Sequence, residues 1–483
     1  MDEPTDNPLP PQAEAGGRKP KTAIVLIHGM GEQRPMGTLW GFVEAAWCAD
    51  RRLVDGYDAE VYAKPDTIND SFELRRVTTR YWKGEPQRRV DFFEFYWAHL
   101  MRGNTVHGVV GWLVSLFVRW PSSVPRSLLW AWLVGLALLA LCLFFAGAAM
   151  LPGEVAERWI PQGWAAGLAA VSFFLSLFAA SWLAPVAGDA ARYFSPNPDN
   201  VDARQKIMRA GVQVIERLTA TGDYDRIILV GHSLGSAIGL DILHHAFGRV
   251  TRERWEAAHA DGSPAVAALA ALEKAAGQLL EAPGDPAGRA AFRTAQRAYA
   301  AALRAGWSEG ISPWLVTDFV TLGSPLSKAD ILVARTAGEL ELFKARREIP
   351  TCPPKLETRK PPKFSYRTGG AAIPHHGAVY GPTVWTNVYQ PHRFVACGDI
   401  ISGPVAPLFG PGVMDLELPQ PGFRFTHNDY WIRPQDASPG TPVDALRRGL
   451  NLRLEAEGDL WGNADTGGMI ATNGLPGRPN GAS

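Results

Sequence analysis

Short apolar runs alternate along the chain with amphipathic segments. Five runs have the length and β-branched content of strands buried on both faces. They are 22–27, 90–97, 226–230, 315–322 and 384–389. Helical spacing of apolar residues fills 36–49, 201–221 and 234–247. This alternation predicts an α/β fold, a mostly parallel sheet with helices on both faces.

An Ala-rich segment, 252–307, interrupts the alternation and has high helix propensity. The sequence PGDPAG at 283–288 breaks it into two parts. We therefore expect a helical insertion. The sequence does not decide whether its role is that of a lid, a partner surface or a peripheral addition to the fold. The stretch 350–382, rich in Pro, Lys and Gly, is expected to be an irregular surface excursion.

Two runs carry no formal charge, residues 127–151 and 164–183. At roughly 1.5 Å per residue, each is long enough to span a hydrocarbon core of about 30 Å. Basic residues outside the pair put both flanks on the cytoplasmic side. We expect a multi-pass membrane protein with two spans, preceded by a short interfacial helix. A pair of core helices in a large soluble domain is the alternative.

These features divide the chain into segments. Residues 1–20 carry prolines and acidic residues and are expected to be disordered. The α/β domain is expected over 21–107 and 193–461, with the membrane insertion at 108–192 between its two parts. Residues 462–483, rich in Gly, Asn and Pro, are expected to be a flexible tail.

Charge and cysteine content exclude several classes of protein. Lys plus Arg and Asp plus Glu are both 48, so the chain lacks the basic excess of a nucleic-acid binder. The four cysteines are far apart, which argues against a disulfide scaffold or a zinc ribbon. The pair His375–His376 lacks a spaced ligand partner, so we expect a solvated loop there, and neither a metal nor a cofactor.

The segment GHSLG at 231–235 carries the strongest chemical signal. It follows an apolar strand and opens a helix, the setting that exposes a nucleophilic serine on a strained turn. Gly231 and Gly235 remove side chains where strand and helix pass closely. Ser233 is the candidate nucleophile, with an ordinary turn serine as the alternative.

A serine nucleophile needs a histidine base and an acid that follow it in the chain. His244 and His245 lie on the serine's own helix, which leaves a few downstream histidines. These are His375, His376, His392 and His427. We favour His427, because it lies in RFTHNDYW near the end of the sheet pattern.

Asp399 is the favoured acid, because it follows the strand 384–389 by a loop. Asp415 and Asp429 are rivals, although Asp429 is too close to His427 in sequence to orient it. Asp318 lies inside a strand pattern and is expected to face the sheet surface.

Stabilising an oxyanion requires two N–H donors. One is expected from the backbone of Leu234, directly after the serine. The other is expected from Met30 in the loop HGMGEQRP, where Gly29 and Gly31 let the amides turn inward. His28 is expected to bond the loop.

The chain resembles the serine lipases and esterases of the α/β-hydrolase superfamily, as a membrane-anchored member. The matching segments are IVLIHGMGE at 24–32, ILVGHSLGS at 228–236, FVTLGSPL at 319–326, WTNVYQPHRFVACGDIISGP at 385–404 and HNDYW at 427–431. The resemblance implies Ser233 as nucleophile, Asp399 as acid and His427 as base. It also implies the amides of Met30 and Leu234 as oxyanion donors.

The expected function is therefore hydrolysis of a carboxylic ester through an acyl-enzyme. The membrane anchor would favour a lipid or another amphiphilic ester. A membrane-tethered scaffold with a hydrolase-like fold is an alternative from another class. A thioesterase or an acyltransferase would use the same residues. The sequence identifies no protein partner.

Overall fold

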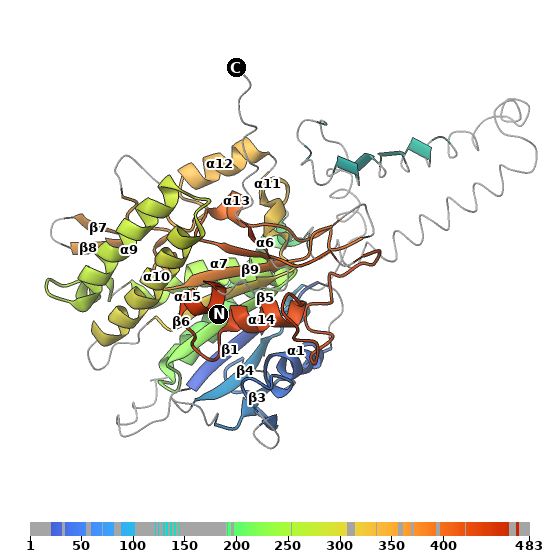
Figure 1. Cartoon of the computed structure of the whole chain (residues 1–483), viewed down its shortest axis with the longest axis horizontal. Helices are drawn as coiled ribbons and strands as arrows, with labels where there is room; N and C mark the ends of the chain where they lie inside the picture. Colours follow the sequence, from blue (N-terminus) through green and yellow to red (C-terminus); the bar gives the residue numbers. More distant parts are fainter. Residues whose placement is uncertain are drawn as a thin grey trace, which may run out of the picture.

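A single large sheet organises the protein. The computed structural model describes most of 21–101 and 198–462, scattered positions between 121 and 194, and 470–472. In this part of the chain nine strands form the sheet, in the order β11-β10-β9-β6-β5-β1-β4-β3-β2 (Figure 1). The strands are β1 (Lys21–Ile27), β2 (Val61–Pro65), β3 (Arg75–Thr79), β4 (Arg89–Phe95), β5 (Arg226–His232), β6 (Val316–Leu322), β9 (Val384–Tyr389), β10 (Met414–Glu417) and β11 (Ile470–Thr472). The six strands from β10 to β4 run parallel, so the predicted mostly parallel sheet is confirmed.

The strands bury both faces because their side chains alternate between two apolar clusters. In β1, Val25 and Ile27 belong to one cluster, and Ile24 and Leu26 belong to the other. The first cluster includes residues of α6 (Pro198–Ala220) and α7 (Leu234–Thr251). The second includes residues of α1 (Gly37–Val43) and α14 (Pro442–Leu450). Helices therefore cover both faces, as predicted.

The strand order reverses direction at β1, which pairs with β4 on one side and with β5 on the other. The helix after β1 is α1 and the helix after β5 is α7, and the two pack on opposite faces of the sheet. A crevice forms at such a switch point, outside the carboxyl ends of the strands. The chain places its GHSLG turn at this position.

The Ala-rich segment forms α8 (Trp255–Ala258), α9 (Pro264–Glu281) and α10 (Pro286–Gly306). Ser263 caps α9 by accepting the N–H of Ala265. Figure 1 shows α9 and α10 side by side. Phe292 and Tyr299 of α10 are fully buried in the main cluster. The predicted helices are confirmed, and they contribute to the core of the domain.

The remaining elements are short, and the sequence did not predict them individually. They are η1 (Glu44–Cys48), η3 (Ala98–Leu100), η6 (Pro325–Lys328), α11 (Ala329–Leu332), α12 (Ala337–Ala345), β7 (Ser365–Thr368), β8 (Ala371–Pro374), η7 (Ala378–Tyr380), α13 (Ala406–Phe409) and α15 (Glu457–Gly462). The stretch expected to be irregular, 350–382, contains the β7–β8 hairpin. The range expected to be a tail differs at 470–472, where β11 pairs with β10.

The expectation of a membrane protein with two spans and a cytoplasmic catalytic domain is corrected by this structure. Among the described residues, no helix combines the length and the apolar character that crossing a bilayer requires. The longest described helices, α6 and α10, carry several charged residues each. The predicted span 164–183 lies outside the described residues, and only scattered positions of the other predicted span, 127–151, are described. Residues 1–20 and nearly all of the predicted insertion, 108–192, also lie outside the described residues.

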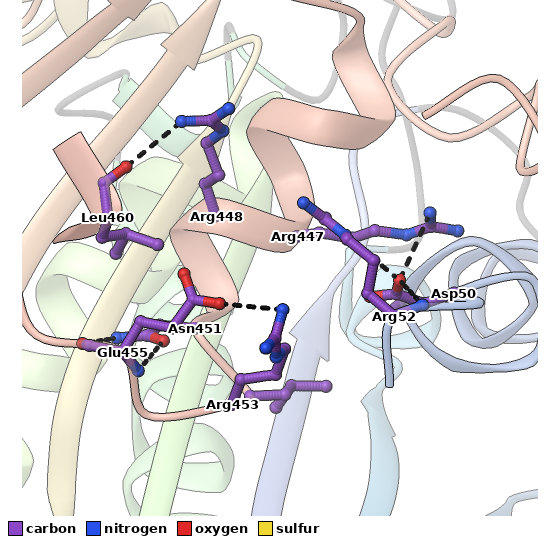
Figure 2. A pocket seen from close by; sticks show the side chains of 10 residues that line it. Asp50, Arg52, Arg447, Arg448, Asn451, Arg453, Glu455 and Leu460 are labelled. Carbon is purple, nitrogen blue, oxygen red and sulfur yellow. Dashed lines mark hydrogen bonds and ion pairs between the residues drawn. The ribbon is translucent and has the colours of Figure 1, made fainter. Parts of the chain in front are cut away.

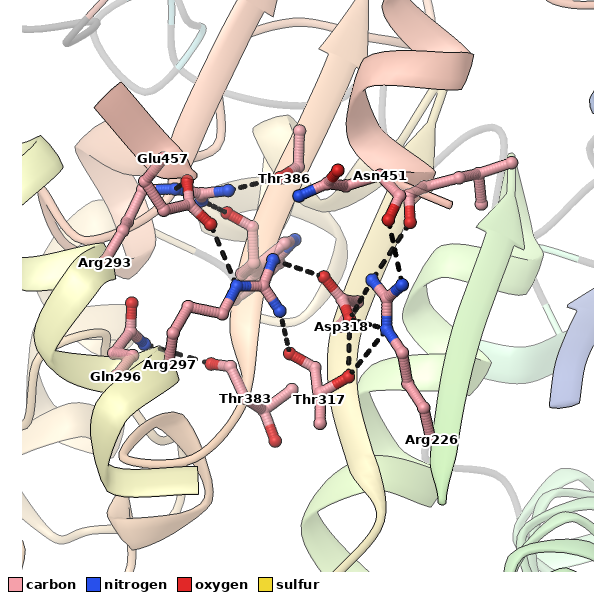
Figure 3. A network of polar contacts seen from close by, with 12 residues as sticks. Arg226, Arg293, Gln296, Arg297, Thr317, Asp318, Thr383, Thr386, Asn451 and Glu457 are labelled. Carbon is pink, nitrogen blue, oxygen red and sulfur yellow. Dashed lines mark hydrogen bonds and ion pairs between the residues drawn. The ribbon is translucent and has the colours of Figure 1, made fainter. Parts of the chain in front are cut away.

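A buried ionic network ties α10 to the sheet (Figure 3). Asp318, at the start of β6, binds Arg226 at 2.7 Å and Arg297 at 2.6 Å. Glu457 of α15 binds Arg297 at 2.9 Å and Arg293 at 2.7 Å. These alternating charges are mutually satisfied although four of the five side chains are almost fully buried. This anchoring argues against a lid role for α10.

Replacing one acid of the network should destabilise the fold in a pH-dependent way. Burial raises the pKa of Glu457, but Arg293 and Arg297 outweigh it and lower the pKa from 4.5 to about 2. Its contribution is thus complete above pH 4.5 and disappears as the pH falls towards 2. We expect Glu457→Gln to lose about 3 kcal/mol at pH 7, because Arg293 stays buried without its acid. Urea unfolding at several pH values measures this.

The matched control is Glu455→Gln, because Glu455 pairs with Arg453 on the partly exposed surface. That variant should change stability by less than about 0.5 kcal/mol. Equal stability of Glu457→Gln and wild type at pH 7 would show that the network is not stabilising.

Candidate active site

The turn between β5 and α7 holds Ser233 in a strained conformation. Its backbone angles are φ 53° and ψ −128°, a region that non-glycine residues rarely adopt. Its N–H donates to the Leu322 carbonyl on β6 at 2.9 Å, and its own carbonyl accepts from Ser236 at 2.9 Å. The hydroxyl makes no capping bond to α7, so it is available for another partner.

Three predicted glycines allow this turn to pack. A Cβ on Gly235 would overlap the carbonyl oxygens of Ile27 and His28 at the end of β1. A Cβ on Gly231 would lie 2.6 Å from the Gly235 oxygen, and one on Gly29 would lie 2.9 Å from the Ser233 Cβ. The ends of β1 and β5 therefore meet at backbone distance around the serine. Gly31 lies outside the described residues.

Ser233 and His427 lie 194 positions apart in sequence and are in hydrogen-bonding contact. The Ser233 Oγ is 2.8 Å from the His427 Nε2. On the other side of the ring, Nδ1 is 2.9 and 3.0 Å from the two oxygens of Asp399. An ionised carboxylate only accepts, so Nδ1 carries the proton and Nε2 is the acceptor for the hydroxyl. The structure thus brings the three predicted residues together in line.

The carboxylate of Asp399 is held as an anion by several donors. The N–H groups of Ile401 and Ser402 donate to Oδ1 at 3.0 and 3.2 Å. The Tyr430 hydroxyl donates to Oδ2 at 2.9 Å. Burial raises the pKa of Asp399, but the charge of His427 and these hydrogen bonds outweigh it and lower the pKa to about 2. Asp399 is therefore ionised at neutral pH.

Backbone bonds join the loops that carry the acid and the histidine. The N–H of Gly398 donates to the Arg424 carbonyl at 2.8 Å, and the N–H of Thr426 donates to the Gly398 carbonyl at 3.2 Å. The first loop follows β9 and the second follows β10. Because each bond lies next to a site residue in sequence, the pair fixes the separation of Asp399 and His427.

The rival acids have other partners. Asp415 on β10 accepts from Asn387 and from the N–H groups of Val405 and Ala406, at 2.7 to 2.9 Å. Asp429 pairs with Arg424. Asp318 is buried in the ionic network, so the expectation that it faces the sheet surface is wrong. Of these carboxylates, only Asp399 is bonded to His427.

The histidine pair at 375–376 also differs from the expected solvated loop. His375 is buried, and its Nδ1 accepts the N–H of Gly377 at 2.9 Å. The two rings lie 4.0 Å apart. Within the described ranges, no group of three or more His, Cys, Asp or Glu is arranged to hold a metal.

Two residues of the site were not predicted from the sequence, although both lie in the quoted motifs. His232 donates from Nε2 to the backbone carbonyl of His427 at 3.0 Å. Burial, and then the nearby His427, lower the pKa of His232 to about 3, so this ring is neutral. Tyr430 binds Asp399 and lies three residues after His427. The signal that could have identified them is their place in the quoted motifs, directly before Ser233 and three residues after His427.

The predicted oxyanion donors flank the serine. Leu234 is the first residue of α7, and in the part of the chain that is described its N–H has no acceptor. Met30 is half-buried directly after Gly29, and its role as the second donor stays a prediction. His28 donates from Nδ1 to the Gly29 carbonyl at 2.8 Å, and its own carbonyl accepts from Trp97 at 2.9 Å. This matches its expected loop-bonding role.

A small pocket beside α14 has no aligned nucleophile, base and acid among the residues that line it (Figure 2). Its volume is about 30 Å³, enough for about one water molecule. Arg447 donates to the carbonyls of Ala45 and Pro434 and pairs with Asp50, and Arg448 binds Asp444. Arg447 thus joins α14 to the residues after α1, whereas Arg448 pairs within α14, and both roles are structural.

Comparisons with protein-family models, curated proteins and solved structures find no match for this chain.

The close approach at the turn yields a test within a single helix. Gly235→Ala should destabilise the protein by about 3 kcal/mol, because the new Cβ overlaps backbone that cannot move easily. Gly248, also on α7, has no atom within 4 Å of an added Cβ. Gly248→Ala should therefore stabilise by about 0.5–1 kcal/mol. Chemical denaturation measures both, and similar effects of the two substitutions would contradict the packing described for the turn.

Proposed function

We propose that the protein is a serine hydrolase of the α/β-hydrolase fold that cleaves carboxylic esters through an acyl-enzyme. The observation that carries this proposal is the continuous hydrogen-bond line from the Ser233 Oγ through His427 to Asp399. A turn serine with only a structural role would not need a strained backbone, a hydroxyl that makes no capping bond and an aligned base at the same position. The resemblance of the sequence motifs to serine lipases and esterases supports the same conclusion.

In the proposed first step, the Ser233 Oγ attacks the ester carbonyl carbon while the His427 Nε2 takes the hydroxyl proton. Asp399 stabilises the resulting imidazolium through Nδ1. The tetrahedral oxyanion binds the N–H of Leu234 at the helix terminus and, as the second donor, that of Met30. His427 then protonates the leaving alkoxide, and the acyl group stays on Ser233.

In the second step a water molecule gives its proton to His427 and attacks the acyl carbon, and Ser233 leaves with the proton returned by Nε2. The Ser233 side chain is only 1% exposed, so little bulk water competes for the hydrogen bonds that these two reaction steps need. The neutral state of His232 also supports the proposed mechanism, because a positive charge on His232 would destabilise the imidazolium that forms on His427.

The substrate class is broader than the sequence suggested. The argument for a lipid ester depended on a membrane anchor, and that argument no longer applies. The proposal therefore concerns carboxylic esters in general. A thioester would be cleaved by the same first step. An acyl acceptor other than water would change only the second step. Assays with a panel of thioesters and a panel of acceptor alcohols would separate these cases.

The first test is covalent labelling by a fluorophosphonate probe. The wild-type protein should be labelled, and Ser233→Ala should lose all labelling because the hydroxyl that His427 activates is gone. Ser236→Ala is the matched control. The Ser236 hydroxyl donates to the Gly231 carbonyl at 2.9 Å and has no contact with His427, so labelling should persist. Labelling of Ser233→Ala at the wild-type rate would refute the proposed nucleophile.

A second test concerns the hydroxyl behind the acid. Tyr430→Phe removes one donor to Asp399 and should slow labelling roughly tenfold, since a hydrogen bond to a charged group contributes about 1.5 kcal/mol. Tyr224→Phe removes a comparable bond, to the buried Asp91, far from the site. It should affect the melting temperature and leave the labelling rate unchanged. Equal rates for Tyr430→Phe and wild type would exclude a role for this hydroxyl.

A further inference from the structure

A buried lysine lies behind the proposed acid. Lys328 ends the short helix η6, two residues after the segment FVTLGSPL, and its exposed fraction is 8%. Its Nζ donates to the carbonyl of Ser402 at 3.2 Å. A Cβ on Gly403 would lie 3.1 Å from the same nitrogen, so the loop backbone passes directly over the ammonium group.

This contact reaches Asp399 through one residue. The N–H of Ser402 donates to Asp399 Oδ1, while the carbonyl of Ser402 accepts from Lys328. The Ser402 hydroxyl donates to the Gln390 carbonyl at 3.3 Å, at the end of β9. Lys328 therefore holds the residue whose N–H orients one oxygen of the carboxylate.

A charged side chain is costly to bury, and the structure provides few groups to offset that cost. Within the described residues, the Lys328 ammonium group makes a single hydrogen bond, to a neutral carbonyl, and the carboxylates that act on it are Asp399 and Asp330. Burial lowers the pKa of Lys328 from 10.5 to about 8, against the opposing effect of these two acids. The side chain is thus mainly cationic at neutral pH. A methionine at this position would fill a similar volume without the desolvation cost.

We propose that Lys328 is a positioning residue of the triad, whose ammonium group holds the Asp399 loop and offsets part of the negative charge that Asp399 presents to His427. This inference rests on the proposed function. The ammonium group does not touch substrate or the reacting atoms. It acts through Asp399: it fixes the loop that carries the carboxylate, and its positive charge weakens the attraction between the carboxylate and a positive charge on the imidazole.

The test is the pH dependence of fluorophosphonate labelling in the full-length protein. Lys328→Met should label roughly tenfold more slowly, and the acid limb of its rate profile should move upward by about half a pH unit, because a positive charge near the triad is gone. Lys328→Arg keeps the charge and a donor, so its limb should coincide with that of the wild type. Lys328→Gln keeps a donor without the charge and should show the shifted limb.

Lys344→Met is the matched control, because Lys344 is equally buried but pairs with Glu341 on α12. The Lys344→Met substitution should leave the acid limb of the labelling-rate profile at the wild-type pH. A slower rate for Lys328→Met with an unshifted limb would overturn the inference, since a purely structural contact predicts that result. Failure of the proposed function looks different: wild type would not label, or Ser233→Ala would label as well as wild type.

Discussion

The close approach between the end of β1 and the first turn of α7 is the constraint on which the site depends. Gly235 lies against the last carbonyls of β1, and Gly29 lies against Ser233. Larger residues at these positions would push the helix away from the sheet. The strained angles of Ser233 are then maintained by packing and by its bond to Leu322. The local strain costs about 1–3 kcal/mol, which the surrounding domain must offset.

The opposite end of the sheet supplies much of that support. Arg226 begins β5 and binds Asp318 together with the carbonyls that end α14. Asp318 lies in the first half of β6 and continues the network to α10 through Arg297. Ion pairs between side chains thus fix the amino ends of β5 and β6, and a backbone hydrogen bond from Ser233 to Leu322 joins their carboxyl ends. The helical insertion is thus tied, through Arg297, to the end of the sheet opposite Ser233.

Much of the sheet and all three residues of the proposed triad could be predicted from the sequence. Strands β1, β5 and β9 are buried along nearly their whole length, and the first two contain continuous apolar runs that the sequence shows directly. Strand β10 has four residues and two of them are acidic, which hides it from such a search. The two uncharged runs predicted to span a membrane lie almost entirely outside the described residues, and no described helix is long and apolar enough for a span.

The choice among acids shows where sequence reasoning ends. Asp399 and Asp415 are both fully buried and both follow or lie within strands. Their environments shift their pKa values in opposite directions. Burial raises the pKa of Asp415 to about 6 despite its backbone donors, whereas the charge of His427 outweighs burial at Asp399. An acid that must stay ionised beside an imidazolium therefore has to face a cation, and only the folded chain decides which carboxylate does. The same reasoning applies to Lys328, whose position three residues after a GSP turn gives no hint that its charge lies behind that carboxylate.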